Sequence, residues 1–286
     1  MTLYLIDTRE EEPYQYLKQS AEEKNISVKR ITSQREIENL EHPVSSDDIV
    51  YRTEGGERMR AVEGICIMKG ATPLASPARH TIQWSTQASE IQGTRFIPQR
   101  RILEYDETLI ERFVSELEGY PVVLKILGHS HGEGVKKCNF REELKEGISS
   151  VDFETQVVYL KRYIESDGHL RVIVLGDRVL GAIKYIKPGH DFRTNLRNSV
   201  SVEPASIDAS TAQLAIRAVH NENHVFGGVD VILDTDKTPY VMEMNTPCYF
   251  PRVQDALNVD ISGEIIEYLT QKASRNQSME MTRTVL

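Results

Sequence analysis

The chain has 286 residues, 40% of them hydrophobic, which suits two or three packed subdomains of a globular protein. Its formal net charge of -9 argues against a nucleic acid or an anionic membrane as the main partner. The sequence has no stretch of membrane-spanning length, no signal-peptide pattern, and three cysteines without metal-binding or disulfide-framework spacing. We therefore expect a cytoplasmic protein with reduced thiols.

The first hundred residues alternate short apolar segments with polar helical ones, and this rhythm predicts a parallel α/β domain over residues 1–95. Turn-forming residues place its boundary between Pro73 and Pro98. The elements expected before that boundary are strands at 3–6, 26–31 and 48–51 and a helix at 11–24.

A central lid subdomain is expected over residues 96–165. It begins with a helix over 108–117 and continues through a buried strand over 122–127 into a glycine-bearing loop. The strands predicted next, at 156–164, 170–175 and 178–186, include a hairpin and so indicate an antiparallel sheet.

The C-terminal subdomain is expected over residues 166–273. A helix over 211–221 leads into strands at 227–233 and 240–245, which a short turn joins. An amphipathic helix over 261–271 closes this subdomain, and a flexible polar tail is expected over 274–286.

The loop after the strand at 122–127 has the composition of a phosphate-covering loop. Lys125 stands near the end of the strand, and His131, Gly132 and Gly134 follow. Glycines let backbone N–H groups approach an anion, and lysine adds a point charge. The segment matches neither the Walker pattern nor the dinucleotide fingerprint. Taken alone, a hairpin turn with a surface lysine is the preferred interpretation.

Three oxygen-bearing side chains are expected to converge on the last hairpin. Glu243 and Asn245 alternate along one strand and so share a face, while Asp230 interrupts an apolar run on the preceding strand. Pairing of the two strands brings all three together as ligands for Mg²⁺, with Mn²⁺ as an alternative ion. Solvated hairpin charges are an equally weighted alternative.

Two further segments carry candidate binding groups. Arg193 and Asn195 are two residues apart and suit a phosphoryl group or a carboxylate. Arg171 is another cationic candidate, for which an ion pair inside the sheet is the alternative interpretation. The stretch around residues 159–165 suits a hinge whose backbone pairs with an adenine edge, although an ordinary strand end is favoured when it is judged alone. The hinge residues singled out are Lys161, Arg162, Tyr163, Ile164 and Glu165.

In this order the motifs resemble the ATP-grasp superfamily, and its RimK-like carboxylate–amine ligase branch in particular. The resemblance runs from about Gly119 to Gln271 and is most specific in DFRTNL and in the VMEMN strand. It implies an α/β (α+β) ATP-grasp fold, in which an N-terminal parallel α/β domain precedes two subdomains that clasp ATP.

Carried over to this sequence, the resemblance implies that Lys125 contacts ATP phosphates and that the glycine loop forms a lid. It implies an adenine hinge at 160–163 and a Mg²⁺ site made by the three oxygen-bearing residues. Arg193 and Asn195 are implied to face the γ-phosphate and an acyl phosphate, and Arg171 to lie on the substrate side.

Some residues depart from the pattern of that branch. No lysine occurs around residues 79–89, where family members usually carry an earlier nucleotide-binding lysine. Lys161 and Arg162 replace a common Gln-Glu pair, and Thr246 to Phe250 replace a turn of small residues. Substrate selection is therefore expected to differ.

The function that these observations predict is an ATP-dependent ligase that joins a carboxylate to an amine through an acyl phosphate, with ADP and phosphate as products. Its partners are then small-molecule or peptide carboxylates and amines, with neither nucleic acid nor membrane, and a homo-oligomer is possible. A small-molecule kinase on the same scaffold and a non-catalytic nucleotide-binding module are the alternatives.

Overall fold

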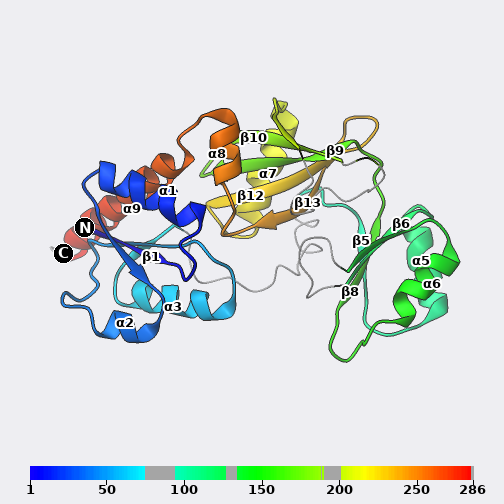
Figure 1. Cartoon of the computed structure of the whole chain (residues 1–286), viewed down its shortest axis with the longest axis horizontal. Helices are drawn as coiled ribbons and strands as arrows, with labels where there is room; N and C mark the ends of the chain where they lie inside the picture. The colour runs from blue at the N-terminus through cyan, green and yellow to red at the C-terminus, as the bar shows by residue number, and fades with distance from the viewer. Residues whose placement is uncertain (75–93, 127–133, 188, 190–200, 285–286) are drawn as a thin grey trace.

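Three sheets follow one another along the long axis of the molecule (Figure 1). The structure is a computed structural model that describes residues 1–74, 94–126, 134–187, 189 and 201–284, with side chains as far as residue 278. The middle sheet belongs to the C-terminal part of the chain and lies between the N-terminal domain and the lid (Figure 1). The predicted fold class, a mixed α and β architecture with a parallel N-terminal sheet, is confirmed.

The N-terminal sheet is parallel with strand order β2-β1-β3-β4. Its central strand carries Leu3 and Leu5 on one face and Tyr4 and Ile6 on the other, and all four side chains are buried in two different clusters. The sheet is therefore covered on both sides, as parallel sheets usually are. Its elements are β1 (Thr2–Ile6), α1 (Glu12–Glu23), β2 (Ser27–Ile31), α2 (Gln34–Glu38), β3 (Ile49–Arg52), α3 (Glu57–Met68) and β4 (Thr72–Pro73).

The lid contains an antiparallel sheet of order β5-β8-β6-β7. Leu124 and Leu160 point to the face that the two lid helices cover. Because side chains alternate along a strand, Val123, Lys125 and Lys161 point to the opposite, inner face. The elements are β5 (Gln99–Ile102), α5 (Glu107–Glu116), β6 (Val122–Ile126), β7 (Val135–Cys138), α6 (Arg141–Ser149) and β8 (Val158–Arg162).

The middle sheet has the order β11-β10-β9-β12-β13. One face packs on helix α7 through valines such as Val172, Val174 and Val229. The other face is apolar where it meets the N-terminal domain, at Ile173 and Phe226, and polar further towards the lid. The elements are β9 (Gly168–Leu175), β10 (Arg178–Ile186), β11 (Val202–Pro204), α7 (Ala209–Asn221), β12 (Phe226–Leu233) and β13 (Pro239–Asn245).

The chain ends with α8 (Pro251–Leu257) and the long helix α9 (Ile261–Thr284), which lies beside α1 (Figure 1). The helix extends to Thr284, beyond the predicted end at Gln271, and the flexibility expected for residues 274–286 stays a prediction. Lys272 donates to the backbone oxygen of Pro73 at 2.8 Å, and Gln277 donates to Asp47 at 2.7 Å. These contacts fix the helix against the N-terminal domain.

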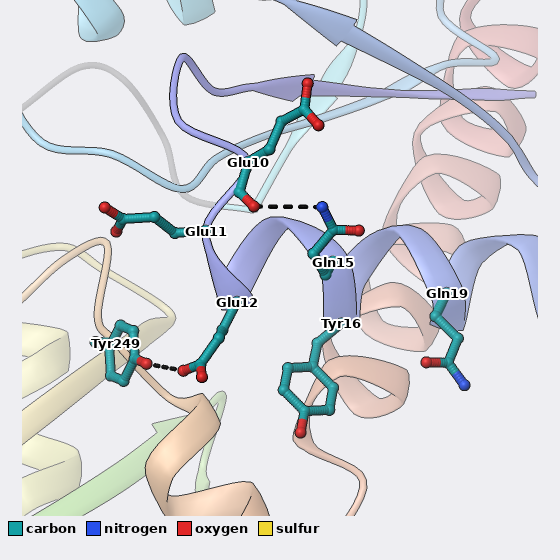
Figure 2. A pocket seen from close by; sticks show the side chains of 7 residues that line it. All are labelled: Glu10, Glu11, Glu12, Gln15, Tyr16, Gln19 and Tyr249. Carbon is teal, nitrogen blue, oxygen red and sulfur yellow. Dashed lines mark hydrogen bonds between the residues drawn. The ribbon is translucent and has the colours of Figure 1, made fainter.

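The strand that carries Asn245 is tied to the N-terminal domain by the segment that follows it. The Tyr249 hydroxyl donates to the Glu12 carboxylate, and the two side chains point towards each other across a pocket at the start of α1 (Figure 2). Nearby, the Tyr16 hydroxyl donates to Asp255 on α8 at 2.5 Å. Helix α1 is thus held to the C-terminal subdomain at two points.

The lid joins the middle sheet through residues 94–98, where Phe96 forms a parallel bridge with Val241 of β13. Val241 donates to the backbone oxygen of Arg95 at 2.8 Å, and Ile97 donates to that of Val241 at 3.0 Å. This segment continues directly into β5 of the lid sheet. Among the described helices, none is long and apolar enough to cross a membrane.

Candidate active site

A pocket opens between the inner face of the lid sheet and the polar part of the middle sheet. Cationic side chains enter it from the lid, and carboxylates enter it from β12 and β13. The residues that line it are Ile97, Val123, Lys125, Val135, Lys161, Arg162, Tyr163, Ile164, His169, Asp230, Ile232, Met242 and Glu243.

Lys125 and Glu243 meet across this pocket, with the lysine Nζ 3.3 Å from Glu243 Oε2. Lys125 comes from β6 of the lid and Glu243 from β13 of the middle sheet. Loss of hydration raises the pKa of Glu243, but the opposing charges of Lys125, Lys161 and Arg171 lower its pKa overall. The Glu243 carboxylate is therefore held in its ionised form.

The predicted convergence of oxygen donors is present in the geometry. Asp230 of β12 is directly opposite Glu243 of β13, and Gly228 is opposite Asn245. The amide Nδ2 of Asn245 lies 3.4 Å from Asp230 Oδ2, so its side chain points towards the carboxylates. A register irregularity between Asp230 and Val231 follows this pair.

This donor set fits a hard cation that is shared with a ligand. Two carboxylates and one amide oxygen are the donors that Mg²⁺ prefers. Within the described ranges, no group of three or more His, Cys, Asp and Glu side chains is placed to hold a metal alone. The residues present therefore suit Mg²⁺ that completes its shell with phosphate oxygens and water, as it does in nucleotide sites.

Arg171 forms a bidentate ion pair with Asp230 across neighbouring strands. Both its Nε and its Nη2 donate to the carboxylate, and the Nη2–Oδ2 distance is 2.9 Å. Loss of hydration lowers the pKa of Arg171, but Asp230 outweighs it and raises the pKa above its ordinary value. A Cβ on Gly228 would lie 3.2 Å from Arg171 Cδ and 2.9 Å from Cys248 Cβ, so glycine leaves room for both.

His169 belongs to the same cluster, although the sequence analysis did not select it. Its ring stacks on Tyr185 at 4.8 Å between centroids, and its Nε2 lies 3.6 Å from Asp230 Oδ1. Burial lowers the pKa of His169 despite the nearby carboxylate. The available signal was that His169 and Arg171 are two residues apart on one strand and so share a face.

Four of the five predicted hinge residues line the pocket, and Glu165 does not. Lys161 and Arg162 are still inside β8, and Arg162 donates its backbone N–H to Pro98 at 2.9 Å and its side chain to Glu118 at 2.6 Å. Tyr163 and Ile164 continue along the pocket after the strand ends. Glu165 is outside the pocket lining and accepts from Tyr163 at 2.8 Å and Lys187 at 3.1 Å.

Some predicted residues cannot be placed. His131, Gly132, Arg193 and Asn195 lie outside the described residues, as does the region without lysine at 79–89. Gly134 is described: its φ of 74° forms the end of the β6–β7 turn, and its carbonyl accepts from Ile126 at 2.8 Å.

A cationic lid sheet that faces carboxylate and amide side chains on a second antiparallel sheet is the arrangement of the ATP-grasp class. The chain belongs to the RimK-like ATP-grasp domain family, because the model of that family matches residues 90–269, more than half of the chain. The match includes both the lid and the middle sheet.

Curated relatives agree with this membership. A probable alpha-L-glutamate ligase from Rhodopirellula baltica is 30% identical over 159 residues, or 55% of this chain and 39% of that protein. One from Stutzerimonas stutzeri is 31% identical over 178 residues, or 61% of this chain and 57% of that protein. The chain therefore spans about half the length of the curated relatives that it matches.

Among solved structures, the ATP-grasp ligase PsnB complexed with minimal precursor has a TM-score of 0.73 at 17% identity, covering 95% of this chain and 99% of that chain. D-alanine–D-alanine ligase from Bacillus anthracis has a TM-score of 0.68 at 18% identity, covering 98% and 99%. At these identities the likeness shows the fold, and here it includes the N-terminal domain that the family model leaves out.

Proposed function

We propose that the chain is an ATP-dependent carboxylate–amine ligase, which forms an amide or peptide bond through an acyl phosphate and releases ADP and phosphate. The observation that carries this proposal is the meeting of Lys125 from the lid with Glu243 from the middle sheet in one pocket. A lysine beside a carboxylate on separate sheets suits a ligand that combines phosphate with a bound cation.

In this proposal Asp230, Glu243 and Asn245 hold Mg²⁺, and Mn²⁺ is an alternative ion. When bound, the metal neutralises charge on the transferred phosphoryl group. Lys125 supplies a further positive charge to the phosphates, and the backbone after β8, at Tyr163 and Ile164, supports the base. Arg193 and Asn195 are proposed to contact the transferred phosphoryl group, and His131, Gly132 and Gly134 to cover it.

The proposed reaction needs no nucleophile from the protein. The substrate carboxylate attacks the terminal phosphorus of ATP with loss of ADP, and the amine then displaces phosphate from the acyl carbon. Cys248 is the thiol beside the site, but it is buried and loss of hydration raises its pKa to about 12. Such a thiol is protonated at neutral pH and is not a nucleophile there.

The substrates are proposed to be small or peptide carboxylates and amines. The curated relatives are named alpha-L-glutamate ligases, and PsnB was solved with a precursor, so an amino acid and a peptide are the two substrate classes to test first. Acidic composition supports neither nucleic acid nor membrane as a partner. The free, buried cysteines support a reducing, cytoplasmic setting.

A phosphate-release screen tests the proposal directly. The protein, Mg²⁺ and ATP are incubated with pairs drawn from amino acids and short peptides, and positive wells are analysed by mass spectrometry. The account predicts release that depends on both an acid and an amine, with a condensed product that has lost one water. A phosphorylated product without phosphate release would identify a kinase instead, and nucleotide binding without turnover would indicate a binding module.

A further inference from the structure

Lys161 is a second lysine on the inner face of the lid sheet. In β8 it is opposite Val123 of β6, while Lys125 is opposite Tyr159. The two lysines are therefore diagonal neighbours on one face, where Cβ atoms lie on the order of 7–8 Å apart. Both line the pocket that Glu243 enters from the other side.

Among the described residues no carboxylate is paired with Lys161, whereas three lysines nearby each have one. Lys125 pairs with Glu243 at 3.3 Å, Lys184 with Asp167 at 2.7 Å and Lys187 with Glu165 at 3.1 Å. The side chain of Lys161 makes no hydrogen bond and no ion pair with any residue in the described part of the chain. Its ammonium group is thus placed in a pocket where no described residue supplies an acceptor.

Desolvation of this ammonium group costs free energy. Loss of hydration and the charge of Lys125 lower the pKa of Lys161 to about 8, and Glu243 opposes them only partly. A desolvated cation is retained in a folded protein when a bound group satisfies it. The missing partner of Lys161 is therefore expected on a ligand.

Charges in the pocket indicate which part of a nucleotide provides that partner. Among the described residues, Arg171 and Asp230 neutralise each other and Arg162 pairs with Glu118, so Lys125 and Lys161 face the one remaining charge of Glu243. A bound divalent cation would increase the positive excess. Phosphates carry several negative charges and can balance it, whereas a nucleobase is neutral.

We propose that the Lys161 side chain binds a phosphate oxygen of the nucleotide together with Lys125, so that the two lysines that line the pocket hold the phosphate chain. This inference rests on the proposed function, since it requires a nucleotide in this pocket. It assigns the Lys161 side chain to the phosphates rather than to the base, which lies further along at Tyr163 and Ile164.

Calorimetric binding of ADP and of IDP, in which a carbonyl replaces the adenine amino group, tests the assignment with Mg²⁺ present. The wild-type protein is compared with Lys161→Met, Lys161→Arg and Lys136→Met; Lys136 is on the outer face of the same sheet and pairs with Glu146. Lys161→Met is expected to weaken both nucleotides by the same factor, about tenfold to a hundredfold. Lys161→Arg should retain most of the affinity, and Lys136→Met should match the wild type.

Two results would overturn the inference while leaving the proposed function intact: unchanged ADP affinity in Lys161→Met, or a changed ratio of ADP to IDP affinity, which would place the lysine on the base. Absence of nucleotide binding to the wild-type protein would reject the inference and the proposed function together. Circular dichroism of each variant checks that it is folded, and Lys161→Arg provides a second substitution that keeps the charge.

Discussion

Lys125 Nζ lies 3.3 Å from Glu243 Oε2, although the two residues are 118 positions apart and come from different sheets. This contact joins the lid to the strand that carries the proposed metal ligands. A ligand that binds both groups must enter between them, so the pair marks the point where phosphate and metal are expected to meet. The predictions below follow from this pair and its neighbours.

Glu243→Gln is expected to reduce phosphate release by at least about a hundredfold, because the amide keeps the shape of the side chain but loses the charge that holds a cation. The fold should persist, since Glu243 is only partly buried. Glu146→Gln is the matched control, a lid carboxylate that pairs with Lys136 outside the pocket. Full activity in Glu243→Gln would contradict the metal assignment.

Arg171→Met should destabilise the protein by about 3–5 kcal/mol, because it leaves the Asp230 carboxylate buried without its partner. Urea unfolding gives the free energy of unfolding for comparison. The double variant Arg171→Met/Asp230→Asn removes the orphaned charge and should recover part of the loss. If the single variant were as stable as the wild type, the ion pair would contribute little to the fold.

Lys161→Met should raise the free energy of unfolding near pH 7 by about 1–2 kcal/mol, after allowance for partial exposure. The pKa of Lys161 is about 8 in the folded protein, below its ordinary value of 10.5, so the folded state binds fewer protons between these pH values. The free energy of unfolding of the wild-type protein therefore rises as pH increases from about 8 to 10.5. Over this range the difference in free energy of unfolding between Lys161→Met and the wild type shrinks. Urea unfolding near pH 7 and near pH 9.5 measures that difference; a difference that grew with pH would contradict the assigned pKa.

Cys248→Ala should retain phosphate release within about twofold, because a buried thiol whose pKa burial raises to about 12 supplies no nucleophile. Thiol-directed alkylation of the native protein should be slow at neutral pH and fast after unfolding, since all three cysteines are buried. Rapid loss of activity on alkylation, together with an inactive Cys248→Ala, would show instead that the thiol takes part.

Truncation after Ala273 should lower the free energy of unfolding by about 1–3 kcal/mol. It removes the side-chain contact of Asn276 with Thr72 at 3.3 Å and that of Gln277 with Asp47 at 2.7 Å. The double substitution Asn276→Ala/Gln277→Ala separates these contacts from the loss of helix length. An unchanged unfolding midpoint in the truncated protein would instead favour the predicted flexible tail over 274–286.

Pairing inside the last hairpin was predictable because it is local. Asp230 and Glu243 flank a short turn, and period-two alternation puts Glu243 and Asn245 on one face, so the sequence alone brings these side chains together. Lys125 was predictable as a strand-end lysine before a glycine-bearing loop. Its contact with Glu243 was not, because it depends on how the lid sheet faces the middle sheet.

The cross-strand neighbours of Asp230 were harder to predict. β9 and β12 are adjacent in the sheet but far apart in sequence, and no turn fixes their register. The bidentate Arg171–Asp230 pair follows from that register, whereas the stacking of His169 on Tyr185 follows from the pairing of β9 with β10. The side-chain position of Lys161 likewise depends on β8 lying between β5 and β6.

The helical end of the chain was missed for a different reason. Residues after Ser274 are polar and show no strong apolar stripe, a composition typical of a frayed end. Polar contacts with the N-terminal domain stabilise this helix instead, and such contacts leave no hydrophobic periodicity in the sequence.

Transfer of isotopically heavy oxygen from the substrate carboxylate to phosphate tests the central claim most directly. An acid–amine pair found in the phosphate-release screen is supplied with labelled carboxylate oxygen, Mg²⁺ and ATP, and the phosphate is analysed by mass spectrometry. The account predicts that each phosphate released with amide formation carries one labelled oxygen, because an acyl phosphate leaves that oxygen on phosphorus. Unlabelled phosphate would contradict the acyl phosphate and with it the assignment as a carboxylate–amine ligase.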